Sequence, residues 1–524
     1  MSSGAVSGRT LWELIERRAD ATPDALMAVD EDMSTMTFIE FATEAERAAA
    51  GFADYGIRAG SVVSWQLPTW IDSLVLVAAL SRLGAVQNPI LPIYREREVG
   101  FCTAQAGSQL LIVPSVWNNF DFESMATGIS RTNSLSGAPG VDGETTAAAM
   151  QVLVSDRALP QGDPTQLPPM PEQDATTVRW LFYTSGTTAD PKGAKHTDAS
   201  LAAVAAGMGE RLALVARDRS ALVFPFTHIG GITWLFASLQ SGCSLILMES
   251  FHPERTPEVL SRENVTLAGS GTPFHMAYLA AQRKEPTPIF PDVRGFPGGG
   301  APKPPQLVFD IRELFDAPVL SGYGLTEAPI LTMASVDDTD DELAVSEGKP
   351  MAGVELRFIT PDGRICSPGE DGEIRARAPQ LMLGYLDASL DAAAFDDDGF
   401  FRTGDLGRLD ERGNVIITGR LKDVIIRKGE NVSAKEVEDM LFRHERVGDV
   451  AVIGLPDADR GEMVCAVVST APDVDPIDFE EMVDFLKNEG LMIQKIPERL
   501  EIVAAIPRNP SGKILKQQLK DHYS

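Results

Sequence analysis

The chain has 524 residues, 44% of them hydrophobic, and it carries a formal net charge of −29 at pH 7. This length exceeds that of one ordinary domain and the apolar content is ample for sizeable cores, so we expect two or more globular domains. The negative charge disfavours nucleic acid and anionic membrane surfaces as partners, because a polyanion is attracted by a positive field.

Three further observations restrict the class of protein. No apolar run approaches the roughly 20 residues of a membrane-spanning helix, and the first ten residues lack an apolar signal core. The four cysteines are far apart and show no CxxC spacing, which is typical of a cytoplasmic protein in a reducing compartment. The six histidines form neither HExxH nor a His/Cys cluster, so we expect no structural zinc. A hard cation held by phosphates and one carboxylate stays open.

Residues 37–92 alternate between helix-like and strand-like segments. Alternation of this kind predicts parallel sheets that are covered by helices. The expected order is helix 38–56, strand 61–68, helix 70–85 and strand 86–92.

The same pattern returns later in the chain. A strand is expected at 220–226, a helix at 233–242, a strand at 243–248, and another strand ends at a glycine turn within 315–324. By contrast, residues 131–175 are rich in Pro, Gly, Ser and Thr with weak periodicity. We expect them to be largely a surface crossing.

The stretch "LFYTSGTTADPKGAKH", residues 181–196, follows an apolar strand with hydroxyls, glycines and a lysine. Glycines let backbone N–H groups turn toward an anion, hydroxyls add donors and a lysine adds a mobile charge, so the loop suits phosphate. It is not a P-loop, because Lys192 precedes Gly193 instead of being followed by Ser or Thr. The alternative is a solvated Ser/Thr/Gly linker that happens to contain a lysine.

Four more clusters of small, polar and charged residues follow. Lys303 takes the place of the last glycine of GxGxxG in the first of them, so a dinucleotide site is not expected there. Taken singly, each cluster has a structural explanation: Tyr323 as a packing ring, Asp405 as a turn residue, Lys513 as a solvated tail charge. The clusters are "FPGGGAPKPP" (296–305), "SGYGLTEAP" (321–329), "FRTGDLGRLD" (401–410) and "PRNPSGKILK" (507–516).

The pattern of elements changes near residue 410. We expect a turn at 412–414, a strand at 415–418, a break at 419–423, a second strand, and then a helix. Ser433 and Glu436 have the spacing of a capping box at the start of that helix. The residues after the break suffice for a small α+β domain, so we place the domains at 1–420 and 421–524.

Together and in this order, these motifs resemble the adenylate-forming enzymes, the superfamily of acyl-CoA synthetases, amino-acid-activating domains and luciferases. The resemblance spans almost the whole chain and is closest to an acyl-CoA synthetase. It implies an α/β fold in which a large N-terminal domain of sheets covered by helices is joined by a hinge to a small, mobile α+β domain. The matching motifs are "YTSGTTADPKG" for phosphate, "YGLTE" for adenine and magnesium, "RTGDL" for ribose, "GRLKD" for the hinge and "PRNPSGK" for the catalytic lysine.

The resemblance also implies roles for single residues. Its cofactors are ATP and Mg2+, with coenzyme A as co-substrate, and its implied catalytic residues are Lys513, Thr184, Glu327 and His228. Thr326 would meet the α-phosphate, Glu327 would bind magnesium, and Lys422 would be the hinge. The implied ATP-binding residues are Thr184, Ser185, Gly186, Thr187, Thr188, Lys192, Gly298, Gly299, Gly300, Tyr323, Gly324, Thr326, Asp405, Arg420 and Lys513.

Such enzymes attack the α-phosphorus of ATP with a substrate carboxylate and then displace AMP with a thiol. Amino-acid-activating members carry an aspartate in the segment that is "PFTHIGGITW" here, and residues 225–234 contain no carboxylate. We therefore expect an apolar aliphatic, alicyclic, aryl or sterol side-chain acid. The expected pocket residues are His228, Ile229, Ile232 and Trp234. For His228, a core histidine is the structural alternative.

Coenzyme A is the expected acceptor, because little chain follows Lys513 and leaves no room for a fused carrier domain. Its pantetheine arm is implied at Lys428, Gly429 and Glu430, where many relatives have Gly-Gly instead of Lys-Gly. Three alternatives stay open: a ligase that loads a free-standing carrier protein, a non-catalytic nucleotide-binding protein on the same fold, and a light-emitting oxygenase. The identity of the acid and the oligomeric state stay open as well.

Overall fold

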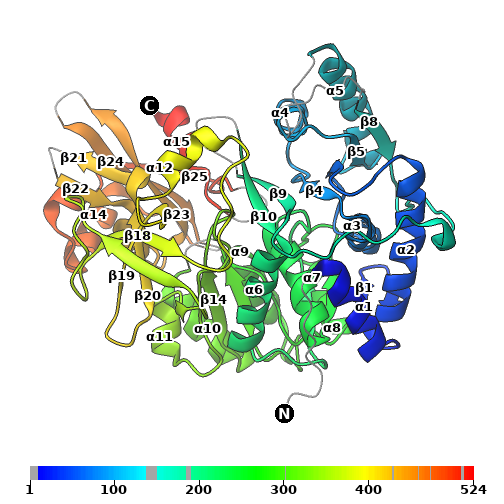
Figure 1. Cartoon of the computed structure of the whole chain (residues 1–524). Helices are drawn as coiled ribbons and strands as arrows, with labels where there is room; N and C mark the ends of the chain where they lie inside the picture. Colours follow the sequence, from blue (N-terminus) through cyan, green and yellow to red (C-terminus); the bar gives the residue numbers. More distant parts are fainter. Residues whose placement is uncertain are drawn as a thin grey trace.

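The computed structural model describes residues 10–136, 150–184, 191–300, 303–427, 430–457, 460–471, 474–508 and 513–524 (Figure 1). In Figure 1 the N-terminal helices (blue) and the C-terminal strands (orange) lie toward opposite ends, with the green strands and helices between them.

A mainly parallel sheet of six strands organises the first part of the chain, in the order β10-β9-β4-β3-β5-β8. Every neighbouring pair is parallel except β9 and β10. Helices α3 and α5 pack against its strands, as expected for a parallel sheet. The elements are β3 (Val62–Trp65), β4 (Val86–Pro89), β5 (Leu110–Val113), β8 (Gln151–Val154), β9 (Val178–Thr184), β10 (Lys192–Thr197), α2 (Phe38–Asp54), α3 (Ile71–Leu83), α4 (Glu96–Ala106) and α5 (Phe122–Ser136).

The alternation predicted for residues 37–92 is confirmed by the succession α2, β3, α3, β4. Helix α2 begins at a complete capping box, in which Thr37 and Glu40 each bond the other's backbone N–H. Helix α3 ends at Gly84, whose φ of 69° glycine adopts without steric cost.

The surface crossing predicted for residues 131–175 is only partly correct. Residues 137–149 lie outside the described residues, and Gln151–Val154 form the edge strand β8, paired in parallel with β5. This strand is too short to produce a periodic signal, so the surrounding Pro, Gly and Ser concealed it.

A second sheet has the order β11-β12-β1-β2. It confirms the strand, helix and strand predicted between residues 220 and 248, which are β11, α7 and β12. Helices α6 and α7 pack on each other, and α1 packs on α7. The elements are α1 (Leu11–Ala21), β1 (Leu26–Asp30), β2 (Thr35–Thr37), α6 (Asp198–Arg211), β11 (Arg219–Leu222), α7 (Ile229–Ser241), β12 (Ser244–Leu247) and α8 (Arg255–Arg262).

A third sheet, β13-β14-β15-β16, adjoins the second. Leu267 joins the two, because it forms single bridges with Ser220 of β11 and with Gly295, which precedes β13. The glycine motifs therefore lie at the carboxyl ends of the parallel pair β13 and β14. The elements are α9 (Thr272–Gln282), β13 (Phe296–Gly299), α10 (Pro305–Phe315), β14 (Val319–Tyr323), β15 (Thr332–Met333), α11 (Asp340–Val345) and β16 (Lys349–Pro350).

A fourth sheet is antiparallel, in the order β17-β18-β19-β20. Its strands are β17 (Glu355–Ile359), β18 (Gly372–Arg377), β19 (Phe401–Leu409) and β20 (Val415–Arg420). The remaining short elements of the N-terminal part are β6 (Val116–Trp117), β7 (Phe120–Asp121), η1 (Pro164–Gln166), η2 (Ala388–Leu390) and α12 (Asp391–Ala394).

The fifth sheet contains only strands from the end of the chain, in the order β22-β21-β24-β23, with β25 paired to β24. The strand predicted at 415–418 extends to Arg420, and the predicted break contains a single 3-10 turn, η3. The predicted second strand is one arm of a hairpin. The elements are η3 (Leu421–Asp423), β21 (Val424–Arg427), β22 (Glu430–Ser433), α13 (Ala434–Leu441), β23 (Val447–Asp457), β24 (Gly461–Thr470), α14 (Phe479–Asn488), η4 (Ile493–Lys495), β25 (Arg499–Val503) and α15 (Lys516–Tyr523).

The capping box predicted for α13 is only half formed. The Ser433 hydroxyl accepts from the Glu436 N–H at 3.4 Å, but the Glu436 carboxylate binds Lys495 instead of returning to the cap. The same hydroxyl donates to the Thr418 carbonyl of β20 at 2.7 Å. Ser433 therefore links the helix start to the preceding sheet.

The two largest hydrophobic cores of the described residues lie in a large N-terminal part and a small C-terminal part of the chain. The largest core extends from Leu11 to Met351, and a second comprises residues between Ile425 and Ile496. The fold is thus α/β with a smaller α+β end, while the boundary between residues 420 and 421 stays a prediction. Within the described ranges, no helix combines the length and apolarity needed to cross a bilayer.

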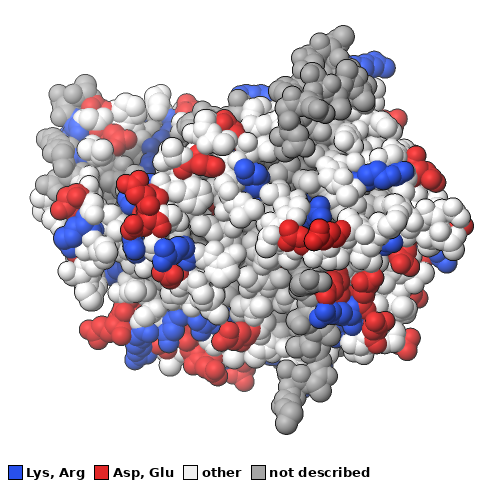
Figure 2. Space-filling view, viewed as in Figure 1, with Lys and Arg blue, Asp and Glu red and all other residues white. Residues whose placement is uncertain are grey.

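Acidic and basic side chains are interspersed over the face shown in Figure 2. The excess of negative charge is therefore not gathered there into a single acidic surface.

Candidate functional site

A cavity of about 580 Å³ lies where the glycine motifs, α7, β19 and the C-terminal end of the chain meet. A second cavity of about 380 Å³ adjoins it and shares Asp405, Arg420 and Lys513 with it. Volumes of this size are typical of small-molecule sites. The predicted residues that line the first cavity are Thr184, Lys192, His228, Ile229, Trp234, Gly298, Gly299, Gly300, Gly324, Thr326, Glu327, Asp405, Arg420, Lys422 and Lys513, and Tyr323 lines the second.

Some predicted residues cannot be placed in this site. Ser185, Gly186, Thr187, Thr188, Lys428 and Gly429 lie outside the described residues, and Glu430 is described only as the first residue of β22.

Glycine is required where β13 and β14 meet the cavity. A Cβ on Gly299 would come within 2.5 Å of the Gly322 carbonyl oxygen, and one on Gly324 within 2.2 Å of the Ile330 nitrogen. No side chain fits at either position without moving the backbone. The two strands therefore offer a flat surface on which a planar ring can lie close to the main chain.

Asp405 is the centre of a buried polar network on β19. It is 3% exposed, its Oδ2 accepts from the Tyr323 hydroxyl at 2.7 Å, and its Oδ1 pairs with the Arg420 guanidinium at 2.9 Å. Arg420 stands opposite Asp405 in the antiparallel register of β19 and β20. Burial, and then the charge of Asp405, raise the pKa of Tyr323 well above its ordinary value. The phenol therefore stays protonated and donates to the carboxylate.

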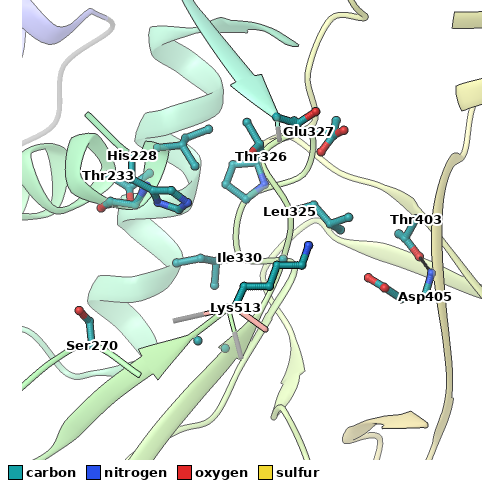
Figure 3. A pocket seen from close by; sticks show the side chains of 18 of the residues that line it. His228, Thr233, Ser270, Leu325, Thr326, Glu327, Ile330, Thr403, Asp405 and Lys513 are labelled. Carbon is teal, nitrogen blue, oxygen red and sulfur yellow. Dashed lines mark hydrogen bonds between the residues drawn. The ribbon is translucent and has the colours of Figure 1, made fainter. Parts of the chain in front are cut away.

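Glu327 presents a carboxylate to the cavity beside Thr326 (Figure 3). It is 9% exposed, and its Oε1 accepts from the Tyr385 hydroxyl at 2.8 Å. The backbone beside it is held by His196, whose Nε2 donates to the Thr326 carbonyl at 2.8 Å. Among the described residues, no group of three or more His, Cys, Asp or Glu side chains is arranged to hold a metal ion. A cation at Glu327 would therefore need most of its oxygen ligands from water and a bound substrate.

The first turn of α7 forms the apolar side of the cavity. His228 caps the helix through Nδ1, which accepts from the Gly230 N–H at 3.1 Å, so the proton of the neutral ring is on Nε2. Burial lowers the pKa of His228 to about 4, and the imidazole is neutral at ordinary pH. Ile229 and Trp234 line the cavity with it, as predicted.

The prediction for Ile232 is wrong. Ile232 is completely buried in the main core and is not part of the cavity wall. With about 100° between successive residues of a helix, the lining residues Ile229, Thr233 and Trp234 cover an arc of about 140° on α7. Ile232 lies about 60° outside this arc, beyond Ile229. The apolar wall is completed by Leu91, Met208, Phe224, Phe274, Ile330 and Met333.

Three cationic side chains line the side of the cavity nearest the C-terminal part: Arg420, Lys422 and Lys513. Burial, followed by the charges of Arg420 and Lys422, lowers the pKa of Lys513 to about 8. In Figure 3 the Lys513 side chain reaches between the wall with Thr326 and the wall with Asp405. This arrangement of like charges suits a polyanionic ligand, which would relieve their mutual repulsion.

Two supporting residues were not predicted. His196 follows Lys192 by four residues in the stretch already singled out, so its position in the sequence was a usable signal. No signal in the sequence pointed to Tyr385, because it is 58 residues from Glu327 in the chain. Only the fold brings the oxygens of these two side chains together. The Lys192 ammonium lies 5.5 Å from the centre of the Tyr385 ring, within the range of a cation–π contact.

Comparison with known proteins agrees with this site. The sequence model of the AMP-binding enzyme family matches residues 15–386, and that of the AMP-binding enzyme C-terminal domain matches residues 436–513. A medium-chain fatty-acid–CoA ligase of Escherichia coli is 28% identical over 98% of this chain and 90% of its own. A salicyl-AMP ligase / salicyl-S-ArCP synthetase of Mycobacterium tuberculosis is 30% identical over 99% of this chain and 91% of its own.

Among solved structures, an o-succinylbenzoate coenzyme A synthetase from Bacillus subtilis, in complex with ATP and a magnesium ion, is similar with a TM-score of 0.81. It is 27% identical in sequence, and the similarity covers 97% of this chain and 99% of that one. The chain therefore belongs to the AMP-binding enzyme family, and it is an adenylate-forming acid–thiol ligase that resembles the acyl-CoA synthetases.

Proposed function

We propose that the protein activates an apolar carboxylic acid with ATP and transfers the acyl group to coenzyme A. The observation that carries this proposal is that one cavity combines a flat glycine surface, an apolar wall and a group of cationic side chains that includes Lys192, Arg420 and Lys513. The glycine surface suits the base of a nucleotide, the cationic side chains suit its phosphates, and the apolar wall suits an apolar acid.

The nucleotide occupies the part of the cavity between the glycine strands and Asp405. Adenine lies flat on Gly298–Gly300 with the ring of Tyr323 beside it, and the ribose hydroxyls donate to Asp405. Both oxygens of Asp405 already accept one hydrogen bond, but each has a second lone pair for this purpose. Thr184 and Lys192, with the hydroxyl loop that follows Thr184, hold the β- and γ-phosphates.

In the first half-reaction, an oxygen of the substrate carboxylate attacks the α-phosphorus. The bond from that phosphorus to the bridging oxygen breaks, and pyrophosphate leaves with the electron pair. The Lys513 ammonium lies between the carboxylate and the α-phosphate and stabilises the negative charge of the crowded phosphorus centre. A well-placed donor of this kind contributes roughly 3–4 kcal/mol.

In the second half-reaction, the thiol sulfur of coenzyme A attacks the acyl carbon. The bond to the adenylate oxygen breaks, AMP leaves, and the thiol proton is lost to solvent. We propose residues 428–430 as the binding site of the pantetheine arm.

Magnesium fits this site as a companion of the phosphates. Glu327 offers one carboxylate, of which Oε1 is oriented by Tyr385, and magnesium in nucleotide sites is commonly held by one or two carboxylates and substrate phosphates. When bound, the ion neutralises phosphate charge. Thr326, next to Glu327, donates to the α-phosphate, and His196 fixes the backbone of both residues.

The acid is apolar, because the described residues around its part of the cavity include no charged group to pair with a second charge. Segment 225–234 contains no carboxylate for a substrate ammonium, and His228 is neutral. The names of the relatives agree with this view, since they include a fatty acid and an aryl acid. Those two names also differ in the acceptor, coenzyme A in one and an aryl carrier protein in the other.

A panel of carboxylic acids assayed by pyrophosphate release tests the proposal. We expect AMP and pyrophosphate to form only with apolar acids, and acyl-CoA to accumulate when free coenzyme A is added, with saturation. The products ADP and phosphate would refute the adenylate route. Failure of free coenzyme A to saturate, together with transfer to an added carrier protein, would refute coenzyme A as acceptor.

A further inference from the structure

A buried lysine lies directly beyond the glycine run of β13. Lys303 is 8% exposed, and its ammonium donates to the Ser321 hydroxyl at 2.8 Å, to the Ser346 carbonyl at 2.6 Å and to Oε1 of Glu347 at 3.1 Å. An ammonium has three N–H groups, so these contacts use all of them. Lys303 therefore has no donor left for a ligand.

What Lys303 holds is the carboxylate of Glu347. The backbone of Glu347 is fixed on both sides, since its N–H donates to the Val415 carbonyl at 2.8 Å and its carbonyl accepts from the Thr332 hydroxyl at 2.7 Å. Its side chain is 19% exposed and lines the cavity of about 380 Å³. Oε2 has no hydrogen-bond partner among the residues that the structure describes.

Glu347 shares this cavity with Gly300, Gly322, Tyr323 and Asp405. In the proposed function the ribose is held at Asp405 and the base lies against the glycines, so Glu347 stands at the outer edge of the base. A carboxylate only accepts hydrogen bonds. Adenine offers an amino group at position 6, whereas guanine and hypoxanthine have a carbonyl acceptor at the same position.

We propose that Glu347 selects the base of the nucleotide by accepting a hydrogen bond from the 6-amino group of adenine. Lys303 is the positioning residue that fixes this carboxylate and balances its charge. The 6-carbonyl of guanine or hypoxanthine would face the same carboxylate, and two acceptors cannot form a hydrogen bond with each other. Because leaving a buried acceptor without a donor costs free energy, such a site binds a base with a 6-amino group much more tightly than a base with a 6-carbonyl group. This inference rests on the proposed function for the place of the base.

Binding of AMP and of IMP, measured by calorimetry without any acid, tests the inference. We expect the wild-type protein to bind AMP at least about tenfold more tightly than IMP, a factor that corresponds to about 1.4 kcal/mol. Glu347→Gln has nearly the same shape but adds an amide N–H that can donate to a carbonyl, so the AMP-to-IMP ratio should fall toward one. Glu285→Gln is the matched control, because Glu285 is exposed and its selectivity should equal that of the wild type.

Lys303→Met removes the positioning charge, and we expect it to lower the same ratio without adding to the effect of Glu347→Gln in the double variant. If Lys303→Met fails to fold, Glu347→Gln decides alone. An unchanged AMP-to-IMP ratio in Glu347→Gln would overturn the inference while leaving the proposed function intact. The proposed function fails separately, if no acid in the panel releases pyrophosphate from ATP.

Discussion

In the proposed adenylation step, the Lys513 ammonium stabilises the negative charge that develops at the α-phosphorus. We predict that Lys513→Ala lowers carboxylate-dependent ATP–pyrophosphate exchange by about 10² to 10³-fold, the usual effect of removing one well-placed donor. Thioester formation from a supplied acyl-adenylate should change little, because no crowded phosphorus centre forms in that step. Measuring both half-reactions on one preparation checks this, and equal losses in both would give Lys513 a different role.

The pH dependence of the adenylation rate should follow the protonation of the Lys513 ammonium. Burial and two neighbouring cations lower the pKa of Lys513 to about 8, so the charged form is present below that pH and is lost as the pH rises through it. We therefore predict that kcat/KM for exchange falls above about pH 8. Lys513→Arg, which stays charged at all these pH values, should be slower but without the alkaline decline. The same decline in the arginine variant would assign it to another group.

The residues that contact the proposed ligands were largely predictable, whereas those that hold them in place were not. Asp405, Glu327 and Lys513 stand in short motifs whose spacing carries the chemistry. Tyr385 and Lys303 act through partners far along the chain, and no local pattern records such contacts. Ile232 was assigned to the pocket because the sequence does not show which apolar residues of a helix face a cavity. Only the orientation of α7 in the fold shows that Ile232 belongs to the main core.

A buried ion pair secures the seam between the second and third sheets, from which the glycine strands extend. Arg294 binds both carboxylate oxygens of Asp218, which is 1% exposed. We predict that Arg294→Met lowers the free energy of unfolding by about 3 kcal/mol or more, because it leaves a buried carboxylate without its partner. Urea denaturation followed by tryptophan fluorescence measures this.

Arg283→Met is the matched control for that experiment. Arg283 also pairs with an aspartate, Asp310, at 2.8 Å, but its side chain is 59% exposed. Exposed pairs contribute about 1 kcal/mol or less, so the control should remain close to the wild type. Equal destabilisation by the two substitutions would show that burial of the Asp218 pair has no special effect.

The secondary structure was predicted correctly where the local sequence pattern and the packing of the fold favour the same element. Residues 37–92 alternate clearly between helix-like and strand-like segments, and the elements follow in the expected order. Strand β8 was missed because its four residues gain their stability from pairing with β5, a long-range contact. The capping box at Ser433 formed only in half, since Lys495 offers the Glu436 carboxylate a charged partner that the sequence did not reveal.

The two proposed half-reactions require different surfaces at one site, so we propose that the C-terminal part moves relative to the rest. We propose Lys422 in η3 as the hinge, between β20 and β21. Proline fixes φ near −65° and restricts the residue before it, and a hinge must adopt two backbone conformations. We predict that Lys422→Pro retains ATP–pyrophosphate exchange, while formation of the coenzyme A thioester falls steeply.

Lys422→Ala separates this effect from the loss of the charge. It removes the same ammonium but leaves the backbone free, so any loss that it shares with the proline variant is due to the charge and not to the backbone. If the proline variant changes both rates in parallel, the hinge lies elsewhere and Lys422 is an ordinary linker residue.

The double hydrogen bonding of Ser433 has a consequence for the resting state of the enzyme. Its hydroxyl starts α13 and also joins the Thr418 carbonyl on the other side of η3. Rotation about Lys422 would separate these two residues, so each catalytic cycle would open and close this bond. A net worth of about 0.5–1.5 kcal/mol amounts to a few-fold bias in population. If Lys422 is the hinge, Ser433 therefore favours, by that factor, the arrangement described here, in which Lys513 lines the cavity.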